Sequence, residues 1–497
     1  MGSITELPIS TTTLLDDAPM ITGAVRMEHR RAGATATAAE ITSALSAAQS
    51  ASRPLALEAQ AVPFAPVSTT DSLHITGPRS ATLTKNSAAI GIEVAPTAVA
   101  LGTATTGGSL TTIPISGASF TVNEHAGKVI DIDNSLGNPQ TRWVLSNDAT
   151  TLTLYEELDE VPADGEAVQI YTPIDEVILD GFTLSGGSLG SAGVVIRKTR
   201  RVILRNLHVL SNGGNGISIY DSGSPVAGEG GGVHVENCVS DGNNFGIFVY
   251  NCDNAVVIGG RYANSTGTSG YNAQLKDCRN SSMIGTRVSG GAHGANSKSS
   301  GLNPTRNVAM IGVTADGCAK SGIYAHALTN EGGTHIGINY TIEGTRATNC
   351  QTGLLLSQPD VGTFVGCHIS NHASYNNSGI GLALQAPGWT WSNLSAERSG
   401  DLGCEVARRT RGAGMTLTNN NYSGSAGPEF KIDNDNTVED CLIEGLIVEH
   451  TDATSASTYA FLEASGNDNN FIRHPRIYDD ISGLASTWEG NFVFNGS

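Results

Sequence analysis

A loose repeat of roughly 24 to 28 residues fills the middle and later parts of the chain. At one edge of the repeat, an Asn opens a short apolar run that ends in Ile-Gly, as in 254–259, 280–285 and 307–312. The other edge is a Gly before a short run, mostly apolar, at Gly193, Gly216, Gly246, Gly270, Gly322 and Gly353. Alternating β-branched runs between Gly and Asn predict strands joined by tight turns. Such units cannot bury their apolar faces alone, so the repeat predicts stacked coils: an all-β, right-handed parallel β-helix.

The composition agrees with a slim solenoid. The 497 residues include 60 glycines and only 5% aromatic residues, which suits many tight turns around a core of Val, Ile and Leu. The formal net charge of −19 argues against nucleic acid and anionic membranes as partners. No apolar run approaches the length of about 18 residues that a membrane span needs. Residues 1–30 also lack the layout of a signal peptide.

The cysteines are too sparse for a disulfide scaffold in a chain of this length. Each follows an Asn, Asp or Gly, and they are Cys238, Cys252, Cys278, Cys318, Cys350, Cys367, Cys404 and Cys441. This placement predicts equivalent corners in successive coils, where a thiol acts as a small apolar stacking residue. No Cys or His spacing fits a metal site, so we expect neither a metal nor another cofactor.

The start of the chain lies outside the repeat. A short helix is expected there, with Thr37 and Glu40 as a capping box and with Ile41 and Leu45 on one face. Laid over the first coil, this helix would cover a sheet edge that a β-helix must protect. Residues 102–172 also break the coil rhythm and predict antiparallel strands with hairpin turns. The expected parts are an arm (1–27), a capping helix with the first coils (28–101), an inserted β module (102–172), a regular β-helix (173–465) and a C-terminal cap (466–497).

Two segments resemble known families. The order of helix, strand and Leu-x-Ile-x-Gly over residues 28–80 is similar to the start of pectate-lyase-like β-helices, including many bacteriophage tailspikes. Residues 126–171, with Gln-x-Arg, Thr-x-Leu-Thr-Leu and Val-Pro in that order, resemble a small β-barrel insert of phage tail proteins. The tailspike resemblance implies a homotrimer on the virion tail or outside the cell. It also implies a host-surface polysaccharide as ligand and contacts to other tail proteins through the N-terminal arm.

An outward-facing stripe of polar and aromatic residues is the candidate binding surface. Strand side chains alternate between core and solvent, so after each marker Gly the second residue should point outward. The predicted outward residues are Ser218, Tyr220, Phe248, Tyr250, Asn272, Gln274, Lys276, Asn296, Lys298, Tyr324 and His326. Aromatic faces stack on sugar rings, and amides bond hydroxyl groups. The expected sugar-binding residues are therefore Tyr220, Phe248, Tyr250, Asn272, Gln274 and Asn296.

Two reactions are compatible with this stripe. Hydrolysis of a glycosidic bond needs a pair of carboxylates, for which Asp221, Glu229 and Glu236 are the candidates. Elimination on a uronate needs a base and a cation that neutralises the carboxylate. The candidates for these roles are Lys276, Lys298, Tyr324 and His326.

We therefore expect a tailspike-like protein that binds and depolymerises a bacterial surface polysaccharide, such as capsule, O-antigen or exopolysaccharide. One alternative is a secreted polysaccharide lyase or epimerase of the pectate-lyase-like kind. Another is a glycan-binding spike or adhesin without catalysis, because no catalytic motif in the sequence is specific.

Overall fold

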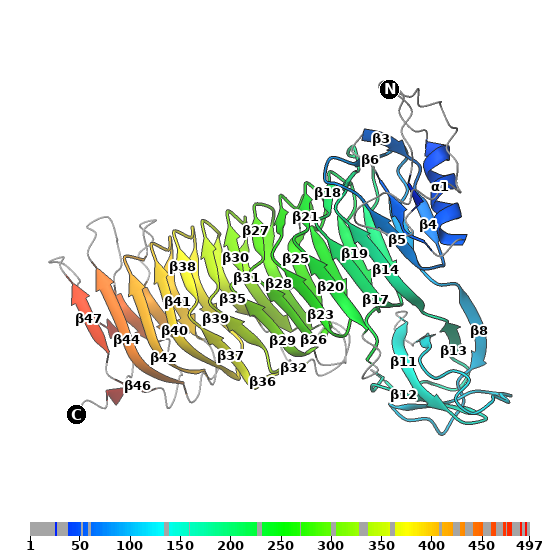
Figure 1. Cartoon of the computed structure of the whole chain (residues 1–497). Coiled ribbons are helices and arrows are strands. Elements are labelled where there is room, and N and C mark those ends of the chain that lie inside the picture. The colour runs from blue at the N-terminus through cyan, green and yellow to red at the C-terminus, as the bar shows by residue number, and fades with distance from the viewer. Residues whose placement is uncertain are drawn as a thin grey trace, which may run out of the picture. The chain divides into compact units, whose positions relative to one another are not determined.

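The computed structural model divides the chain into two compact units, Met1–Tyr262 and Ala263–Ser497. Figure 1 labels their strands and the single described helix. The structure describes residues 25–26, 38–50, 53–57, 61–133, 139–158, 160–225, 231–268, 270–299, 305–327, 336–357, 363–406, 410–420, 428–432, 441–450, 459–463, 471–473, 475–479, 488–489 and 493–494.

The predicted helix is present as α1, Ala38–Ser50. Ile41 and Leu45 are buried, as expected for the face that contacts the first coil. Helix α1 contacts β2 (Leu55–Ala56) and β3 (Ala61–Phe64). The apolar residues at helical spacing therefore place α1 against the start of the β-helix.

The first unit contains two parallel sheets, sheet A and sheet B. Besides β2 and β3, sheet A holds β1 (Val25–Arg26), β5 (Leu73–Thr76), β6 (Thr82–Lys85), β14 (Ile174–Asp180), β15 (Thr183–Ser185), β17 (Thr199–Arg205), β18 (His208–Leu210), β20 (Gly232–Glu236), β21 (Val239–Asp241), β23 (Ala255–Ile258) and β24 (Arg261–Ala263). Sheet B holds β4 (Val67–Thr69), β7 (Ile92–Val94), β16 (Val194–Arg197), β19 (Ile217–Tyr220) and β22 (Ile247–Tyr250).

The coils of the first unit are aligned by their inward side chains. On sheet B, Val194 is in register with Ile217, and Ile217 with Ile247. All three side chains are buried, as the position after each marker Gly predicts. A slip of one residue would turn each of these apolar side chains to solvent, so burial fixes the register.

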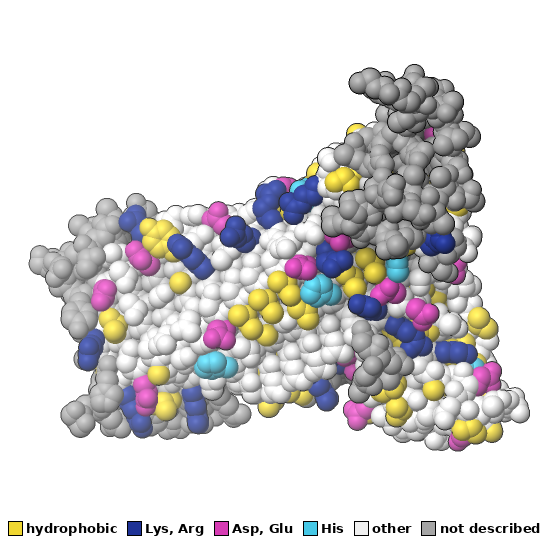
Figure 2. Space-filling view, viewed as in Figure 1, with side chains coloured by type: hydrophobic (Ala, Val, Ile, Leu, Met, Phe, Trp, Pro, Cys, Tyr) yellow, Lys and Arg dark blue, Asp and Glu magenta, His cyan; other side chains and the backbone are white. Residues whose placement is uncertain are grey.

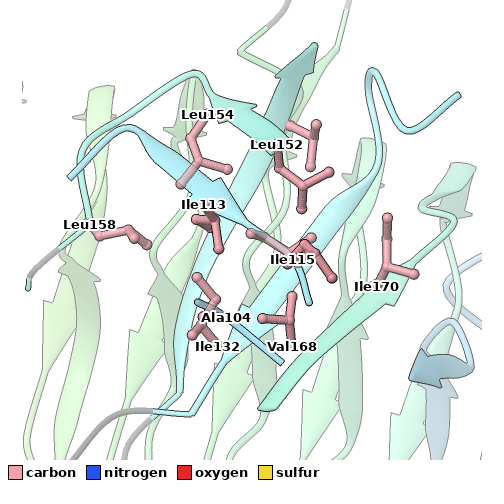
Figure 3. Packing of buried hydrophobic residues seen from close by; sticks show 11 residues of the cluster. Ala104, Ile113, Ile115, Ile132, Leu152, Leu154, Leu158, Val168 and Ile170 are labelled. Atoms are coloured by element: carbon pink, nitrogen blue, oxygen red, sulfur yellow. The ribbon is translucent and has the colours of Figure 1, made fainter. Parts of the chain in front are cut away.

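Six strands that lie in the sequence between β7 and β14 form a separate antiparallel sheet. They are β8 (Ala98–Thr103), β9 (Thr112–Pro114), β10 (Val129–Ile132), β11 (Gln140–Asn147), β12 (Thr151–Leu154) and β13 (Ala167–Tyr171). Figure 3 shows that Ile113, Ile132, Leu152 and Val168 point into one apolar cluster between these strands. We call residues 98–171 the antiparallel module. Its own buried core explains why the coil repeat stops here.

The second unit also contains two parallel sheets. Its sheet A holds β26 (Arg279–Ile284), β27 (Arg287–Ser289), β29 (Thr305–Ile311), β30 (Thr314–Asp316), β32 (Ile336–Ile338), β33 (Thr341–Glu343), β34 (Arg346–Thr348), β36 (Thr363–Val365), β37 (Cys367–Ser370), β38 (Ala373–Tyr375), β40 (Trp389–Glu397), β42 (Arg411–Thr418), β44 (Leu442–His450), β46 (Phe471–Arg473), β47 (Arg476–Asp479) and β49 (Val493–Phe494). Its sheet B holds β25 (Tyr271–Lys276), β28 (His293–Ser299), β31 (Ser321–Ala327), β35 (Thr352–Ser357), β39 (Ile380–Leu384), β41 (Leu402–Val406), β43 (Pro428–Ile432), β45 (Tyr459–Glu463) and β48 (Trp488–Glu489).

Two ladders of side chains stack the coils of the second unit. On sheet B, Ile323, Leu354 and Leu382 are buried in consecutive register. At a turn, the amide of Asn307 donates to Asn280 Oδ1 at 2.8 Å and accepts from Asn339 at 3.0 Å. These three asparagines have φ between 48° and 54°, a left-handed conformation that Asn tolerates better than most residues. These three asparagines thus form an asparagine ladder along the turns of successive coils.

The predictions of an all-β fold and of buried cysteines without a disulfide scaffold are confirmed. All eight cysteines are buried, and none of them forms a disulfide. Parallel pairing of successive coils accounts for every strand that the structure describes outside the antiparallel module. Within the described part of the chain, no helix has the length and apolarity of a membrane span.

Candidate functional site

An aromatic ladder lies on the outward face of sheet B in the first unit. We use this name for Tyr220, Phe248 and Tyr250. Tyr220 is in register with Tyr250, and their ring centroids are 6.2 Å apart. Phe248 lies 5.6 Å from Tyr220 and stacks on Tyr250 at 6.0 Å. On the preceding coil, the guanidinium of Arg197 lies 4.3 Å from the centre of the Tyr220 ring. The three rings are half-buried and keep part of their surface open to a ligand.

A polar cluster lies directly after the strand positions of Arg197 and the aromatic ladder. Lys198, Asp221 and Asn251 each come one residue after a ladder position or Arg197, and all three have φ near 50°. The ammonium of Lys198 lies 3.0 Å from Asp131 Oδ1 of the module and 3.5 Å from Asp221 Oδ2. The Asn251 amide donates to Asp221 Oδ1 at 2.8 Å and to the Thr141 carbonyl at 3.4 Å. The left-handed turn at each strand end therefore directs these side chains toward the antiparallel module.

The carboxylates predicted for hydrolysis are not assembled into a pair on the ladder. Asp221 is buried and already accepts from Lys198 and Asn251, which favours a structural role. Glu236 lies on β20 of sheet A, a different sheet from the ladder, and pairs with His234 at 3.4 Å. Glu229 lies outside the described residues. Among the described residues, hydrolysis by two carboxylates at the ladder is therefore unsupported.

A ring stack lies on sheet B of the second unit. We use this name for Tyr271, His293, Tyr324 and His326. Ring centroids are 4.7 Å apart for Tyr271 and His293, 5.6 Å for His293 and Tyr324, and 5.0 Å for Tyr324 and His326. The planes are tilted by only 20° to 24° in these three pairs. Four rings from three consecutive strands thus lie nearly parallel to one another.

Polar residues of neighbouring coils border the ring stack. Lys276, Lys298 and His326 are in register on β25, β28 and β31, and all three are half-buried. Two residues earlier on each strand, Gln274 donates to Asn296 Oδ1 at 2.6 Å, and Asn296 donates to the Tyr324 carbonyl at 3.3 Å. Lys276, Lys298 and His326 therefore form a partly solvent-accessible edge beside the ring stack.

Several residues predicted to be exposed are in fact buried. Asn272 bonds Ser265 and the carbonyls of Ser289 and Gly290, so its amide serves a coil corner and is not a ligand contact. Gln274 and Asn296 are 3% and 0% exposed and use part of their bonding capacity on each other. Ser218 is also buried. Alternation along the strand did not predict this burial. Asn272 bonds backbone carbonyls at a coil corner, and Gln274 and Asn296 bond each other.

The sequence reasoning missed Arg197, Tyr271 and His293. Tyr271 comes one residue after the marker Gly270, and Tyr271 and His293 each come two residues before an inward Ala, so strict alternation would place both in the core. Their contact with Tyr324 shows instead that they lie on the outward face. Arg197 could have been predicted from the repeat, because it occupies on the preceding coil the strand position that Tyr220 occupies on the next. No local signal marked the other two.

Burial keeps the acid and base groups of the ring stack neutral. It lowers the pKa of His326 to about 4, with help from the charge of Lys298 and from His293. Burial and Lys320 likewise lower the pKa of His293 to about 4. Burial, followed by the nearby Tyr271, raises the pKa of Tyr324 well above its usual range. Near neutral pH, both imidazoles and the phenol are therefore uncharged.

One pair within the stack is hydrogen-bonded. The Tyr324 hydroxyl lies 2.7 Å from Nδ1 of His326. Ser357 also bonds the Tyr324 oxygen and favours its ionised form, so Ser357 is the donor there. The Tyr324 proton is then directed to Nδ1, and the neutral His326 ring carries its own proton on Nε2. In the described structure, Nε2 is buried and has no hydrogen-bond partner.

The described residues contain no group of three or more His, Cys, Asp and Glu side chains that could hold a metal ion. On the face seen in Figure 2, acidic and basic side chains lie singly or in small mixed groups. The negative net charge is therefore not gathered into one patch on that face.

Comparisons with known proteins agree with the strand pairing. A family model described as a right handed beta helix region matches residues 145–273, less than half of the chain. The fold is a right-handed parallel β-helix. No curated protein matches the chain in sequence.

Several solved structures share the arrangement at low identity. The tailspike protein gp49 of Pseudomonas phage LKA1 is 12% identical with a TM-score of 0.40, covering 90% of this chain and 76% of that one. The tailspike gp61 of Pseudomonas phage phi297 is 14% identical with a TM-score of 0.38, covering 88% and 73%. The A-module of the mannuronan C-5 epimerase AlgE6 from Azotobacter vinelandii is 13% identical with a TM-score of 0.37, covering 93% and 96%. Likenesses this remote carry no argument about what this chain binds or does.

Proposed function

We propose that this β-helix binds a bacterial surface polysaccharide on its outward sheet B and depolymerises it. The aromatic ladder of the first unit carries the proposal. Three half-buried rings on two consecutive coils, with Arg197 stacked on Tyr220, form a polar and aromatic surface. Aromatic rings with one apolar face and a polar edge suit the C–H faces and hydroxyl groups of sugars.

The antiparallel module contacts residues that directly follow the strands of this ladder. Asn251, one residue after Tyr250, donates to the Thr141 carbonyl of the module. Lys198, one residue after Arg197, contacts Asp131 of the module. The module therefore lies next to the strand ends of the ladder, and in this proposal a polysaccharide chain bound on the ladder also contacts the module.

The tailspike-like assembly belongs to the same proposal. On sheet A of the first unit, the outward side chains Ile203, Val256 and Ile258 are apolar and half-buried. A surface of this kind suits contact with a second and third copy of the chain around a threefold axis. The proposed location is the virion tail or the extracellular space, with the N-terminal arm as the attachment to other tail proteins.

The test is a screen of capsule, O-antigen and uronate polysaccharides for binding and for new reducing ends. Tyr250→Ala should weaken binding of the responding glycan by about 1 kcal/mol, roughly fivefold, because a stacking face is lost. The matched control is Tyr375→Ala, which removes an exposed ring on sheet A of the second unit. Equal affinity of the wild type and Tyr250→Ala would remove the ladder from the binding site.

The non-catalytic alternative is decided by the same screen. The separation of Asp221 and Glu236 onto different sheets is the observation in its favour. Binding without new reducing ends from any glycan would support a glycan-binding spike and contradict depolymerisation.

A further inference from the structure

We propose that Cys318 and Cys350 form a redox-modification site, at which a hydroperoxide converts the two thiols into a disulfide between successive coils. The inference concerns the second unit alone and does not depend on the polysaccharide function proposed above. It is carried by the stacking of the two cysteines at the same turn of neighbouring coils. Asp316 at the end of β30 is in register with Thr348 at the end of β34, and each cysteine follows two residues later.

The two turns share one backbone conformation. The residue between the strand and the cysteine is left-handed in both, with φ of 66° at Gly317 and 55° at Asn349. The Gln351 amide donates to the Cys318 carbonyl at 3.2 Å, which holds the two turns against each other. Neighbouring strands of a sheet lie about 4.8 Å apart. A disulfide needs its Cα atoms about 4.4–6.8 Å apart, so equivalent positions on two such coils are within its reach.

The thiols occupy a turn position that the following coils fill with polar side chains. The next two coils carry Asn377 and Ser399 there. Asn377 bonds the neighbouring backbone, since its Oδ1 accepts from the Cys350 amide at 2.9 Å. Cys318 and Cys350 instead bond each other through their sulfur atoms. Two adjacent thiols can be oxidised to a disulfide, a reaction that asparagine and serine lack.

The hydrogen bonds make the two sulfur atoms unequal. The thiol and the backbone amide of Cys318 both donate to the Cys350 sulfur, and the thiol's hydrogen bond lowers the pKa of Cys350 against the opposing effect of burial. The same hydrogen bond, together with burial, raises the pKa of Cys318. Because the thiolate is the form that attacks an oxidant, Cys350 should react first and Cys318 second.

Both side chains are buried beneath an exposed turn. Cys318 is 2% exposed and Cys350 is 1% exposed, whereas Gly317, Asn349 and Gln351 on the two turns are exposed. A small hydroperoxide therefore reaches the sulfur atoms when these turns open, without unfolding of the sheets.

The reaction has two steps. The Cys350 thiolate attacks the hydroperoxide, the O–O bond breaks, and Cys350 becomes a sulfenic acid while an alcohol, or water from hydrogen peroxide, leaves with the proton of the thiol. The Cys318 sulfur then attacks the Cys350 sulfur, the S–O bond breaks, and water leaves with the Cys318 proton. The two thiols lose two electrons in total and the hydroperoxide gains two, so no further reactant is needed.

The experiment treats the full, reduced chain with graded hydrogen peroxide, blocks the remaining thiols with maleimide and maps the peptides by mass spectrometry without reductant. The wild type should give one cross-linked species that joins the Cys318 and Cys350 peptides and that dithiothreitol removes. Cys404 is the internal control, because its neighbours in register on β39 and β43 are not cysteines, and it should stay reduced at the same dose. Amide exchange at Gln351 should slow by about tenfold or more in the oxidised protein, since the cross-link keeps the turns closed.

Two variants test the order of attack. In Cys318→Ser, Cys350 should stop at the sulfenic acid, which dimedone traps. In Cys350→Ser, Cys318 should stay unmodified at the dose that cross-links the wild type. Serine already stands at this turn position as Ser399, so both variants should keep the fold, and urea unfolding checks this. The cross-link in the wild type tests the proposal even if a variant misfolds.

Three results would overturn the proposal. These are a native protein that peroxide leaves without the cross-link, cross-links that join other cysteines or two chains, and linkage of Cys318 to Cys350 only after unfolding in urea. Dimedone labelling of Cys318 in Cys350→Ser at the wild-type dose would overturn the assigned order of attack.

Discussion

His372 gives the second unit a built-in sensitivity to acid. Its side chain is 1% exposed, and burial lowers its pKa to about 3. Nδ1 lies 2.7 Å from the Thr345 hydroxyl, and Nε2 lies 2.9 Å from the Ser374 hydroxyl. The Ser374 hydroxyl donates to the Gly381 carbonyl, so Nε2 must be the donor to Ser374 and Nδ1 the acceptor from Thr345. A second proton on Nδ1 would face a hydroxyl already used as a donor.

The size of the effect follows from linkage between protonation and folding. In the unfolded chain, a histidine titrates near 6.5, whereas His372 in the fold stays neutral down to a pH of about 3. Between these values only the unfolded state binds the proton, so stability falls as the pH falls, by about 1.4 kcal/mol per pH unit. From pH 7 to pH 5 the loss is about 2 kcal/mol, and from pH 7 to pH 4 it is about 3 kcal/mol.

The assay is urea unfolding at pH 7, 6 and 5, followed by the fluorescence of Trp389 and Trp391, which are buried in the same unit. His372→Gln should be less stable than the wild type at pH 7, because the hydrogen-bonded ring is lost. Its stability should then fall by about 2 kcal/mol less than that of the wild type on going to pH 5. His293 and His326 are present in both proteins, so their contributions cancel. His368→Gln, at an outward position of β37, is the control. Equal pH dependence in the wild type and His372→Gln would refute the reasoning.

Three further predictions concern the asparagine ladder, the contact of Lys198 with the antiparallel module, and the proposed trimer. Asn307→Ala should lower the free energy of unfolding by about 1–2 kcal/mol, because the two ladder bonds are lost and alanine is strained at a φ of 52°; Asn307→Gly, which tolerates that φ, should cost less in the same urea assay. Lys198→Met should lower the free energy of unfolding by about 3 kcal/mol, because Asp131 and Asp221, both nearly buried, lose their shared cation. Adding Asp131→Asn should recover part of that loss, and no recovery would contradict the pairing. Light scattering should give about three times the chain mass of 51.3 kDa, and a monomer at micromolar concentration would contradict the proposed trimer.

The sequence predicted the coils because their determinants are local and repeated. The position after each marker Gly is buried at Val194, Ile217 and Ile323, as a period of two requires. Asn280 and Asn307 could be placed at turns because asparagine tolerates left-handed backbone conformations and bonds along the stack. Fold class and much of the core were therefore accessible without coordinates.

The candidate site was predicted only in part. Tyr324 and His326 were named from the alternation of one strand, but their hydrogen bond depends on how that strand lies against β28 and β35. His293 escaped notice, because alternation alone would place it in the core. Asp221 pairs with Lys198 and Asn251 on neighbouring coils, and Lys198 also pairs with Asp131 of the antiparallel module. No repeat encodes the contact with the module. The candidate site depends on contacts between segments that the repeat does not relate, whereas the fold depends on contacts between equivalent positions of successive coils.

The buried cysteines make the stability of individual coils measurable. Seven of the eight cysteines lie between strands or at the first residue of a strand, and Cys404 lies within β41, so the thiols are spread over successive coils from Cys238 to Cys441. A buried thiol is inert until its coil opens and water and reagent can reach the sulfur. The rate at which a maleimide modifies each cysteine, read by peptide mass spectrometry, therefore reports the opening free energy of that coil. Eight natural probes would show whether the solenoid frays from its ends or opens first in the middle.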